Sequence, residues 1–311
     1  MSTAASLRSE RDATPQGGRE RPAEREHLWI ANEYAASLAL AGLRSFDAIV
    51  STTHGRLLRR LADRENRRFE LHVAQRGPRG MYLKTHRIRS WRGWLRAKLG
   101  AELGATPGTI EADNIVRLRR LGVATVPLVA CGRRLRGDGT AESFVLTEEL
   151  AGFTQLDHFL RRRFPDVEQA VEGPVAGGPV AGGRLPRDRE LDALIRSVAD
   201  VAARFHGLGF NHRDFYCCHF FIRETLRGRF DVHLIDLQRV EHRRWLRRRW
   251  LVKDLGQLAY SAPRDRVSRA ARMAFIKRYL GVCKLRRADK RLVRAVLARQ
   301  RSLERRHGAH P

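Results

Sequence analysis

The strongest constraint in the sequence is a long helical stripe that is followed directly by a polar loop and a second apolar segment. Over residues 189–209, apolar side chains recur at the spacing of an α-helix with one buried face. The stripe consists of Leu191, Leu194, Ile195, Val198, Val201, Ala202 and Phe205. Residues 211–222 then place charged and imidazole side chains among aromatics, and residues 232–240 form an apolar run that contains Asp236. This order predicts a helical domain in which a chemically rich loop follows a buried helix.

The first half of the chain is expected to form a small antiparallel sheet that carries one helix. Residues 27–46 fit a short helix, and residues 109–123 fit the helix of the sheet, with a threonine start, early acids and a stop at Gly122. The turn at residues 75–80 between two apolar segments is typical of a hairpin. The expected strands lie in residues 47–61, which turn at His54-Gly55, and in residues 67–73, 80–86, 124–132 and 142–150.

The second half is expected to be mainly helical, with further helices at residues 250–262 and 269–281. The Gly, Pro, Val and Ala repeat at residues 173–183 cannot build a core and predicts a flexible surface loop, with a lid or binding loop as the alternative. The predicted divisions are a disordered tail at 1–26, a sheet-bearing domain at 27–150, a helical domain at 151–285 with the flexible loop at 171–187, and a basic helical tail at 286–311.

Charge and cysteine content narrow the class of protein. The net charge of +27 favours a polyanionic partner, although arginine-rich composition can also reflect a GC-rich genome. No apolar run of about 18 residues predicts a transmembrane helix, and the charged N-terminus does not resemble a signal peptide. The four cysteines form no C-x-x-C pair, which favours reduced thiols in a cytoplasmic protein.

Two acids in apolar surroundings are the main candidates for chemistry. Asp214 lies in the loop after the long helix, and Asp236 follows the apolar residues 232–235. A helix, a loop acid, a hairpin and a second acid can place two carboxylates at the mouth of one cleft. Phosphoryl transfer needs such a pair, because one acid orients and deprotonates the attacking hydroxyl while the other holds Mg²⁺ against the phosphates.

A cation for the nucleotide phosphates would complete such a site, and Lys84 is the main candidate. It lies on an expected strand in a chain whose basic residues are nearly all arginine. A lysine on a central strand needs an acidic partner, and Glu111 near the start of the following helix can supply it. Upstream, residues 51–56 place Gly55 in a turn whose backbone N–H groups could cover phosphates.

The order of these parts resembles the protein-kinase-like fold. Residues 147–150, 211–220, 234–240 and 250–262 make the lipopolysaccharide kinase (Kdo/WaaP) family the closer match, and within it the WaaP-type kinases of the core heptose. The resemblance covers residues 45–285. It implies an α+β, two-lobed fold, with a small antiparallel N-lobe that carries one helix and a larger, mainly helical C-lobe.

The resemblance also implies a role for each matching residue. Asp214 would be the catalytic base, and Asp236 would bind Mg²⁺. Lys84, paired with Glu111, would contact the α- and β-phosphates of ATP. The implied cofactors are therefore ATP and Mg²⁺.

The remaining matches would support this machinery. Glu148 and Leu150 would belong to the hinge that meets adenine through backbone groups. Asp254 would anchor the catalytic loop by accepting hydrogen bonds from its backbone N–H groups. His212 and Arg213 are expected to brace the same loop.

The chain departs from the protein-kinase pattern at His219. Protein kinases carry asparagine five residues after the catalytic aspartate, as a second metal ligand, whereas His219 occupies that position here. Imidazole suits Mg²⁺ poorly, so His219 could instead touch a phosphate or the acceptor sugar. No glycine follows Asp236 and no Ala-Pro-Glu motif occurs, which argues against a phosphorylation-switched protein kinase.

Plainer interpretations of these residues remain open. Asp214 could cap backbone groups in a turn, and Asp236 could pair with Arg239. Lys84 could be a surface lysine, and Glu111 could merely favour the start of its helix.

The segments at residues 87–100 and 242–253 mix arginine with tryptophan, which fits an anionic membrane surface or a large anionic acceptor. Core packing and nucleic-acid stacking are alternatives, and nucleic acid is not expected. The resulting hypothesis is an ATP-dependent kinase of a lipopolysaccharide inner-core sugar, most simply heptose, acting peripherally at the cytoplasmic face of the bacterial inner membrane. The rivals are a kinase of Kdo, another glycolipid or a small molecule such as an aminoglycoside, and a non-catalytic basic scaffold.

Overall fold

The computed structural model describes residues 25–90, 95, 104–164, 186–226, 228–243, 245 and 247–308. The chain divides into two compact units. The first consists of Met1–Asp113 with Pro127–Glu149, and the second of Asn114–Val126 with Leu150–Pro311. The predicted N-terminal tail up to residue 24, the repeat at 173–183 and most of the segment 87–100 lie outside the described residues.

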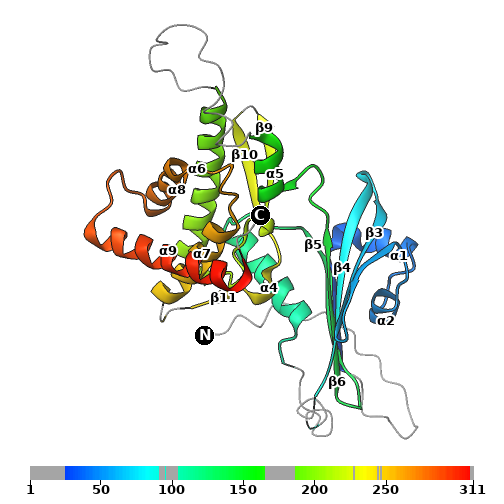
Figure 1. Ribbon diagram of the computed structural model, residues 1–311. Coiled ribbons are helices and arrows are strands. Elements are labelled where there is room, and N and C mark those ends of the chain that lie inside the picture. Colours follow the sequence, from blue (N-terminus) through cyan, green and yellow to red (C-terminus); the bar gives the residue numbers. More distant parts are fainter. Residues whose placement is uncertain are drawn as a thin grey trace, which may run out of the picture. The chain divides into compact units, whose positions relative to one another are not determined.

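The first unit is built on a six-stranded antiparallel sheet with the order β1-β5-β6-β4-β3-β2. In β3, buried Phe69, Leu71 and Val73 alternate with exposed residues, so one face of the sheet is apolar. The prediction of an antiparallel sheet is confirmed. Its strands are β1 (Arg25–Ile30), β2 (Arg56–Arg60), β3 (Arg64–Val73), β4 (Gly77–Arg89), β5 (Leu128–Leu135) and β6 (Thr140–Glu148) (Figure 1).

Helices α1 (Asn32–Leu40) and α2 (Phe46–Val50) contribute to the apolar core of this sheet. Two predictions were wrong here. Residues 27–46 contain strand β1 before α1, so Glu26 belongs to the sheet and not to a tail. Residues 47–50 were predicted as a strand, but Ser45 caps a helix by accepting a hydrogen bond from Ala48 N at 3.2 Å. Burial of Phe46 and Ile49 outweighs the strand preference of β-branched side chains.

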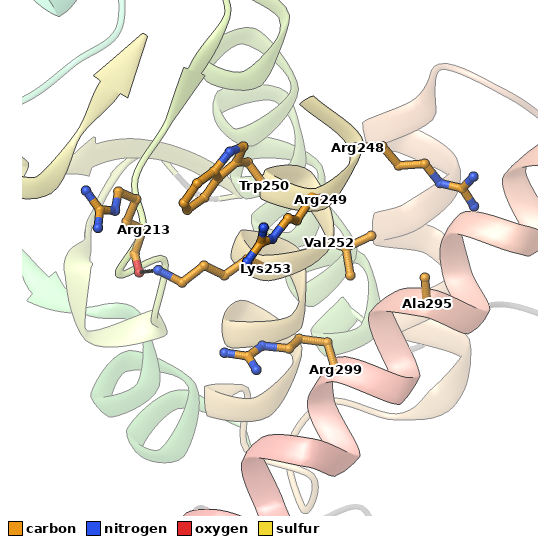
Figure 2. Close-up of a pocket in the computed structure, with 8 residues that line it drawn as sticks. All are labelled: Arg213, Arg248, Arg249, Trp250, Val252, Lys253, Ala295 and Arg299. Carbon is orange, nitrogen blue, oxygen red and sulfur yellow. Dashed lines mark hydrogen bonds between the residues drawn. The ribbon is translucent and has the colours of Figure 1, made fainter. Parts of the chain in front are cut away.

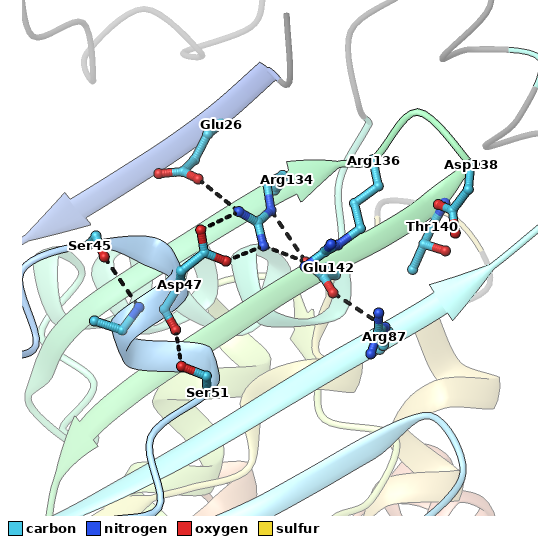
Figure 3. A network of polar contacts seen from close by, with 11 residues as sticks. Glu26, Ser45, Asp47, Ser51, Arg87, Arg134, Arg136, Asp138, Thr140 and Glu142 are labelled. Atoms are coloured by element: carbon cyan, nitrogen blue, oxygen red, sulfur yellow. Dashed lines mark hydrogen bonds and ion pairs between the residues drawn. The ribbon is translucent and has the colours of Figure 1, made fainter. Parts of the chain in front are cut away.

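A buried arginine ties helix α2 to the sheet. Arg134 on β5 is 3% exposed, and its guanidinium lies 2.6 Å from Asp47 Oδ1 and 2.9 Å from Glu142 Oε2 (Figure 3). Glu26 of β1 adds a third carboxylate at 3.4 Å, and the guanidinium carbon lies 4.6 Å from the centre of the Phe46 ring. A charge this deeply buried is tolerated because its donors are all directed at carboxylates.

The second unit is mainly helical, as predicted. Its long helix α6 buries Leu194, Ile195, Val198, Ala202 and Phe205 of the predicted stripe. The helices of this unit are α5 (Leu156–Arg163), α6 (Pro186–Gly207), α7 (Arg247–Ser261), α8 (Arg269–Leu280) and α9 (Arg287–His307), with the short turns η1 (Cys217–His219) and η2 (Leu237–Arg239). Two small sheets complete the unit, made of β7 (Thr154–Gln155), β9 (Phe220–Leu226) and β10 (Arg229–Leu234), and of β8 (Phe210–Asn211) and β11 (Glu241–His242).

Helices α4 and α9 each pack closely against a neighbouring element. Helix α4 (Pro107–Arg120) begins close to β6, where a Cβ on Gly108 would lie 2.8 Å from the backbone of Phe144. The predicted basic helix at the C-terminus is present as α9, but it packs along α7 and is not a detached tail (Figure 1). No helix in the described part of the chain is long and apolar enough to cross a membrane.

Candidate active site

The first unit holds the predicted lysine–glutamate pair. Lys84 Nζ lies 2.8 Å from Glu111 Oε1, and Glu111 is 2% exposed. The pleat of β4 explains the geometry, because Met81 and Leu83 are buried in the apolar core and Lys84, one residue on, projects from the opposite face. The close approach of α4 at Gly108 brings Glu111 to that face. The pairing is as predicted, and the contact with phosphates stays a prediction.

The turn before β2 requires its glycine. Gly55 has a φ of +70°, and a Cβ there would lie 2.2 Å from the backbone oxygen of Arg68. Any other residue would force this turn away from β3. The role of the turn as a cover for phosphates stays a prediction.

At the end of β6, the side chain of Glu148 is engaged in the protein. Its carboxylate accepts hydrogen bonds from Tyr34 and from Arg76 Nη2 at 2.7 Å, and its backbone N–H donates to Pro127 O at 3.0 Å. A contact between adenine and Glu148 would therefore have to use the carbonyl oxygen. The corresponding prediction for Leu150 stays a prediction.

In the second unit, the loop after β8 presents Asp214. Its carboxylate receives two hydrogen bonds from Arg239 Nη1, at 2.8 Å to Oδ1 and 2.9 Å to Oδ2. Its side chain is 22% exposed, and the next residue, Phe215, is completely buried against Phe205 and Phe220. The aromatic anchor fixes the backbone while the carboxylate stays accessible. The sequence offered a pair of Arg239 with Asp236 only as an alternative, and the structure places Arg239 on Asp214.

His219 connects Asp214 to Asp236. Its Nδ1 lies 2.6 Å from the backbone oxygen of Asp214, and its Nε2 lies 3.8 Å from Asp236 Oδ2. Burial by itself lowers the pKa of His219, but contacts with Cys218, the Asp214 carbonyl and the Asp236 carboxylate raise that pKa to about 9. The imidazole is then protonated at neutral pH and has no lone pair to give a metal ion. The role of His219 as a metal ligand stays a prediction.

Asp236 stands in an unusual backbone conformation. Its φ of 57° and ψ of 59° are left-handed, and Arg213 has a φ of 71°. Side chains other than glycine pay on the order of 1–2 kcal/mol for this conformation. Two of the three such residues in the described part of the chain belong to this site. The surrounding fold therefore holds the loop in a shape that its local sequence disfavours.

Asp254 on α7 supplies the anchor that the sequence predicted. Its Oδ2 accepts a hydrogen bond from His212 N at 2.7 Å, and its Oδ1 accepts one from Arg213 N at 3.0 Å. Burial alone would raise the pKa of Asp254, but hydrogen bonds from His206 and the loop lower it. The carboxylate is therefore charged and holds two consecutive backbone N–H groups.

His212 braces the loop from the other side. It is fully buried, its Nε2 lies 2.9 Å from the backbone oxygen of Ile235, and its ring stacks on His219 with centroids 5.6 Å apart. Burial, together with the charge of His219, lowers the pKa of His212 to about 4. His212 is therefore neutral, and it links the segment carrying Asp214 to the segment carrying Asp236.

Sequence reasoning missed three further residues of α7 that hold the loop. Gln257 accepts a hydrogen bond from Phe215 N at 3.2 Å and donates to Arg213 O at 3.0 Å. Ser261 Oγ accepts from Cys217 N at 2.8 Å, and Lys253 Nζ donates to Arg213 O at 2.6 Å. With Asp254, they form a polar stripe at helical spacing within an apolar segment, which was the available signal.

The chemistry of these side chains fits one Mg²⁺ ion held partly by a nucleotide. In the described part of the chain, no three His, Cys, Asp or Glu residues gather as a metal-binding cluster. Mg²⁺ typically binds through one or two carboxylates together with substrate phosphates and water. The side chain of Asp236, 40% exposed, offers such a carboxylate.

Comparisons with known proteins agree with this arrangement. Residues 50–173 and 180–279 match the model of the lipopolysaccharide kinase (Kdo/WaaP) family. The lipopolysaccharide core heptose(I) kinase WaaP of Pseudomonas aeruginosa is 31% identical over 241 residues, which cover 76% of this chain and 81% of the relative. The WaaP protein of Escherichia coli strain K12 is 29% identical over 238 residues, covering 76% of this chain and 81% of that relative.

A solved structure extends the likeness to the fold. The structure described as WaaP in complex with acyl carrier protein has a TM-score of 0.64 and 27% identity, and it covers 90% of this chain and 99% of that chain. The kinase-like α+β fold predicted from the sequence is thereby confirmed. The chain belongs to the lipopolysaccharide kinase (Kdo/WaaP) family.

Proposed function

We propose that this protein transfers the γ-phosphoryl group of ATP to a heptose hydroxyl of the lipopolysaccharide inner core. The observation that carries the proposal is the loop in which His219 contacts both the backbone of Asp214 and the carboxylate of Asp236. The names of the relatives, which are heptose(I) kinases, support heptose as the acceptor.

In this reaction the acceptor oxygen forms a bond to the γ-phosphorus while the bond from that phosphorus to ADP breaks. Asp214 orients the hydroxyl and takes its proton, and ADP leaves with the electron pair of the broken bond. Lys84, held by Glu111, neutralises charge on the nucleotide phosphates. His219 adds a fixed positive charge beside Asp236, where negative charge gathers.

Asp236 is the residue that would hold Mg²⁺, which would screen the charge between the β- and γ-phosphates. His219 would orient Asp236 through the contact of its Nε2 with Oδ2. We propose a site with one protein carboxylate on the metal.

The other acceptors remain alternatives within the same chemistry: Kdo, another glycolipid, or a small molecule of the aminoglycoside type. A basic scaffold without catalysis is the rival from another class. The ion pair of Lys84 and the ordered loop at Asp214 favour catalysis, because a scaffold needs neither.

The deciding experiment measures labelled-phosphate transfer from Mg-ATP to dephosphorylated inner-core lipopolysaccharide. Asp214→Asn serves as the control, because it keeps the shape of the side chain and removes the base. We expect transfer by the native chain and a loss of at least 100-fold in the variant, given the usual size of general-base catalysis (about 10²–10⁴). Mg-ATP binding without transfer by either protein would refute the heptose assignment.

We also propose two partners. Trp245 is 85% exposed in an arginine-rich segment, which fits peripheral contact with an anionic membrane surface, at its cytoplasmic face.

An acyl carrier protein is the second proposed partner, supported by the related complex. An apolar cavity of about 240 Å³, lined by residues of α6, α7, α8 and α9, offers space for an acyl chain. Co-purification with acyl carrier protein, and loss of the complex when the acyl chain is removed, would test this.

A further inference from the structure

Helices α7 and α9 border a basic cavity in the second unit. The cavity has a volume of about 650 Å³, and eight described residues line it (Figure 2). Five of these are cationic and none is acidic: Arg213, Arg248, Arg249, Lys253 and Arg299. Like charges repel when they converge, so such a lining is costly unless an anion offsets it.

Two of these side chains have buried donors that no partner uses. The Nε atoms of Arg213 and Arg299 are buried and make no hydrogen bond in the protein. Buried donors are nearly always satisfied, and an unsatisfied one typically marks a missing ligand, ion or water. Arg213 also pairs with Glu241 through Nη1.

Trp250 provides a flat apolar wall beside these cations. The charged groups of Arg213 and Lys253 lie 5.6 and 5.7 Å from its ring centre. Burial lowers the pKa of Lys253, and the guanidinium groups of Arg239 and Arg213 lower it further, against the opposing charges of Asp214 and Asp254. An aromatic face with cations beside it is a suitable surface for a sugar ring that carries an anionic group.

The backbone of α7 brings Arg299 to this place. A Cβ on Gly256 would lie 2.5 Å from Cγ of Arg299 and 2.9 Å from its Cβ. The stem of Arg299 therefore lies directly against α7, and Arg299 is one of the residues that line the cavity. A larger residue at position 256 would displace α9 and the cation that it carries.

The cavity adjoins the catalytic loop. Arg213 immediately precedes Asp214, and Lys253 donates from the cavity lining to the backbone oxygen of Arg213 at 2.6 Å (Figure 2). We propose that this cavity binds an anionic group, a carboxylate or a phosphate, of the acceptor glycolipid next to the hydroxyl that Asp214 activates. This inference rests on the proposed function and names the part of the acceptor that the protein binds.

The test compares variants of Arg299 in steady-state kinetics with inner-core lipopolysaccharide. Arg299→Met keeps the aliphatic stem on Gly256 and removes the charge, whereas Arg299→Lys keeps the charge. Arg301→Gln is the matched control, because Arg301 is exposed on the same helix and outside the cavity lining. We expect Arg299→Met to raise the KM for the acceptor at least about tenfold, with the KM for Mg-ATP unchanged. Arg299→Lys should recover part of the loss, and Arg301→Gln should behave as the native chain.

Modified acceptors identify the anion. If amidation of the acceptor carboxylates abolishes the difference in acceptor KM between the native and Arg299→Met proteins, the cavity binds a carboxylate. If removal of the acceptor phosphates abolishes this difference in KM, the cavity binds a phosphate. The proposal would be overturned if the difference in KM persisted on an acceptor that lacks both the carboxylates and the phosphates. It would also be overturned if Arg299→Met left the acceptor KM unchanged.

Binding to Asp214→Asn protein separates this proposal from the proposed function. If the native chain transfers no phosphate but the Asp214→Asn protein binds the glycolipid through Arg299, the cavity stands and the kinase assignment fails. If Arg299→Met weakens only the association with an acyl carrier protein and leaves glycolipid binding intact, the cavity is a protein-docking site and the proposal is refuted.

Discussion

Arg239 is the residue that most directly controls the carboxylate of Asp214. Both oxygens of Asp214 accept hydrogen bonds from the same nitrogen of Arg239, whose side chain is 51% exposed. An exposed ion pair contributes little to stability, about 0–1 kcal/mol. Its value lies in holding the carboxylate in one orientation, so Arg239 is a positioning residue.

We expect Arg239→Gln to lower kcat by up to roughly 100-fold, because a displaced catalytic group costs that much. The KM for Mg-ATP should change little, since Arg239 contacts Asp214, the proposed base. Arg239→Lys should recover part of the rate by keeping a charge near Asp214. A variant that unfolds more readily but has normal kcat would show that the pair is only structural.

His212 makes the stability of the fold depend on pH. Its pKa is lowered to about 4 in the folded chain, while an unfolded histidine titrates near 6.5. Between these values the unfolded chain binds a proton that the folded chain does not, so stability falls as the pH drops from about 6.5 to about 4. The loss is on the order of 3 kcal/mol.

Urea unfolding at pH 7 and pH 5 measures this effect. His212→Gln should reduce the dependence of the unfolding free energy on pH in that window. His158→Gln, exposed on α5, serves as the control and should leave it unchanged. An identical dependence in native and His212→Gln proteins would show that other groups cause it.

At the scale of elements, helix α7 organises the second unit because two of its faces contact different parts of that unit. One face carries the polar residues that hold the loop containing Asp214, and another receives α9 at Gly256. Glycine inside a helix normally costs about 1 kcal/mol relative to alanine. Here close helix packing offsets that cost, because no side chain fits between α7 and Arg299.

We expect Gly256→Ala to destabilise the protein by roughly 1–3 kcal/mol, the usual cost of overpacking. Gly207→Ala is the matched control: Gly207 ends α6, and no atom lies within 4 Å of the place where its Cβ would be. That variant should be neutral or slightly stabilising. Denaturant unfolding of both measures the difference, and equal stability would mean that α9 can shift without cost.

At the scale of the whole molecule, the positive charge favours binding to an anionic surface. The net charge is +27, and Trp245 is exposed in an arginine-rich segment. Attraction to an anionic surface depends on salt, because the Debye length falls from about 10 Å at 0.1 M to about 3 Å at 1 M.

We therefore expect the protein to sediment with vesicles that contain anionic lipid and to be released as salt rises to 1 M. Trp245→Ala should weaken binding several-fold, since the indole anchors at the interface. Leu226→Ala, a similar loss of an exposed apolar side chain (63% exposed), is the control. Equal binding to uncharged vesicles would contradict electrostatic attraction.

Much of the fold could be predicted from local patterns. The stripe of α6, the hairpin of β3 and β4, and the C-terminal helix follow from periodicity within one segment. The helix at residues 46–50 could not, because a five-residue apolar segment fits a strand or a helix equally. Burial of Phe46 against Phe144, with ring centres 5.4 Å apart, decides between them.

The sequence by itself determined which residues are the candidates for chemistry. The spacing of Asp214 and Asp236, the lone strand lysine Lys84 and the buried acid Asp254 are all visible in it. These signals are local, because each depends on a charged residue standing within a short apolar segment.

Only the tertiary structure decided how those candidates are paired and charged. It joined Arg239 to Asp214, gave His219 a raised pKa and brought Arg299 of α9 and Arg213 to the lining of one cavity. These properties depend on distances between residues far apart in the chain and on the exclusion of water. No single segment of the sequence determines these distances or the exclusion of water, because both arise only when the helices pack.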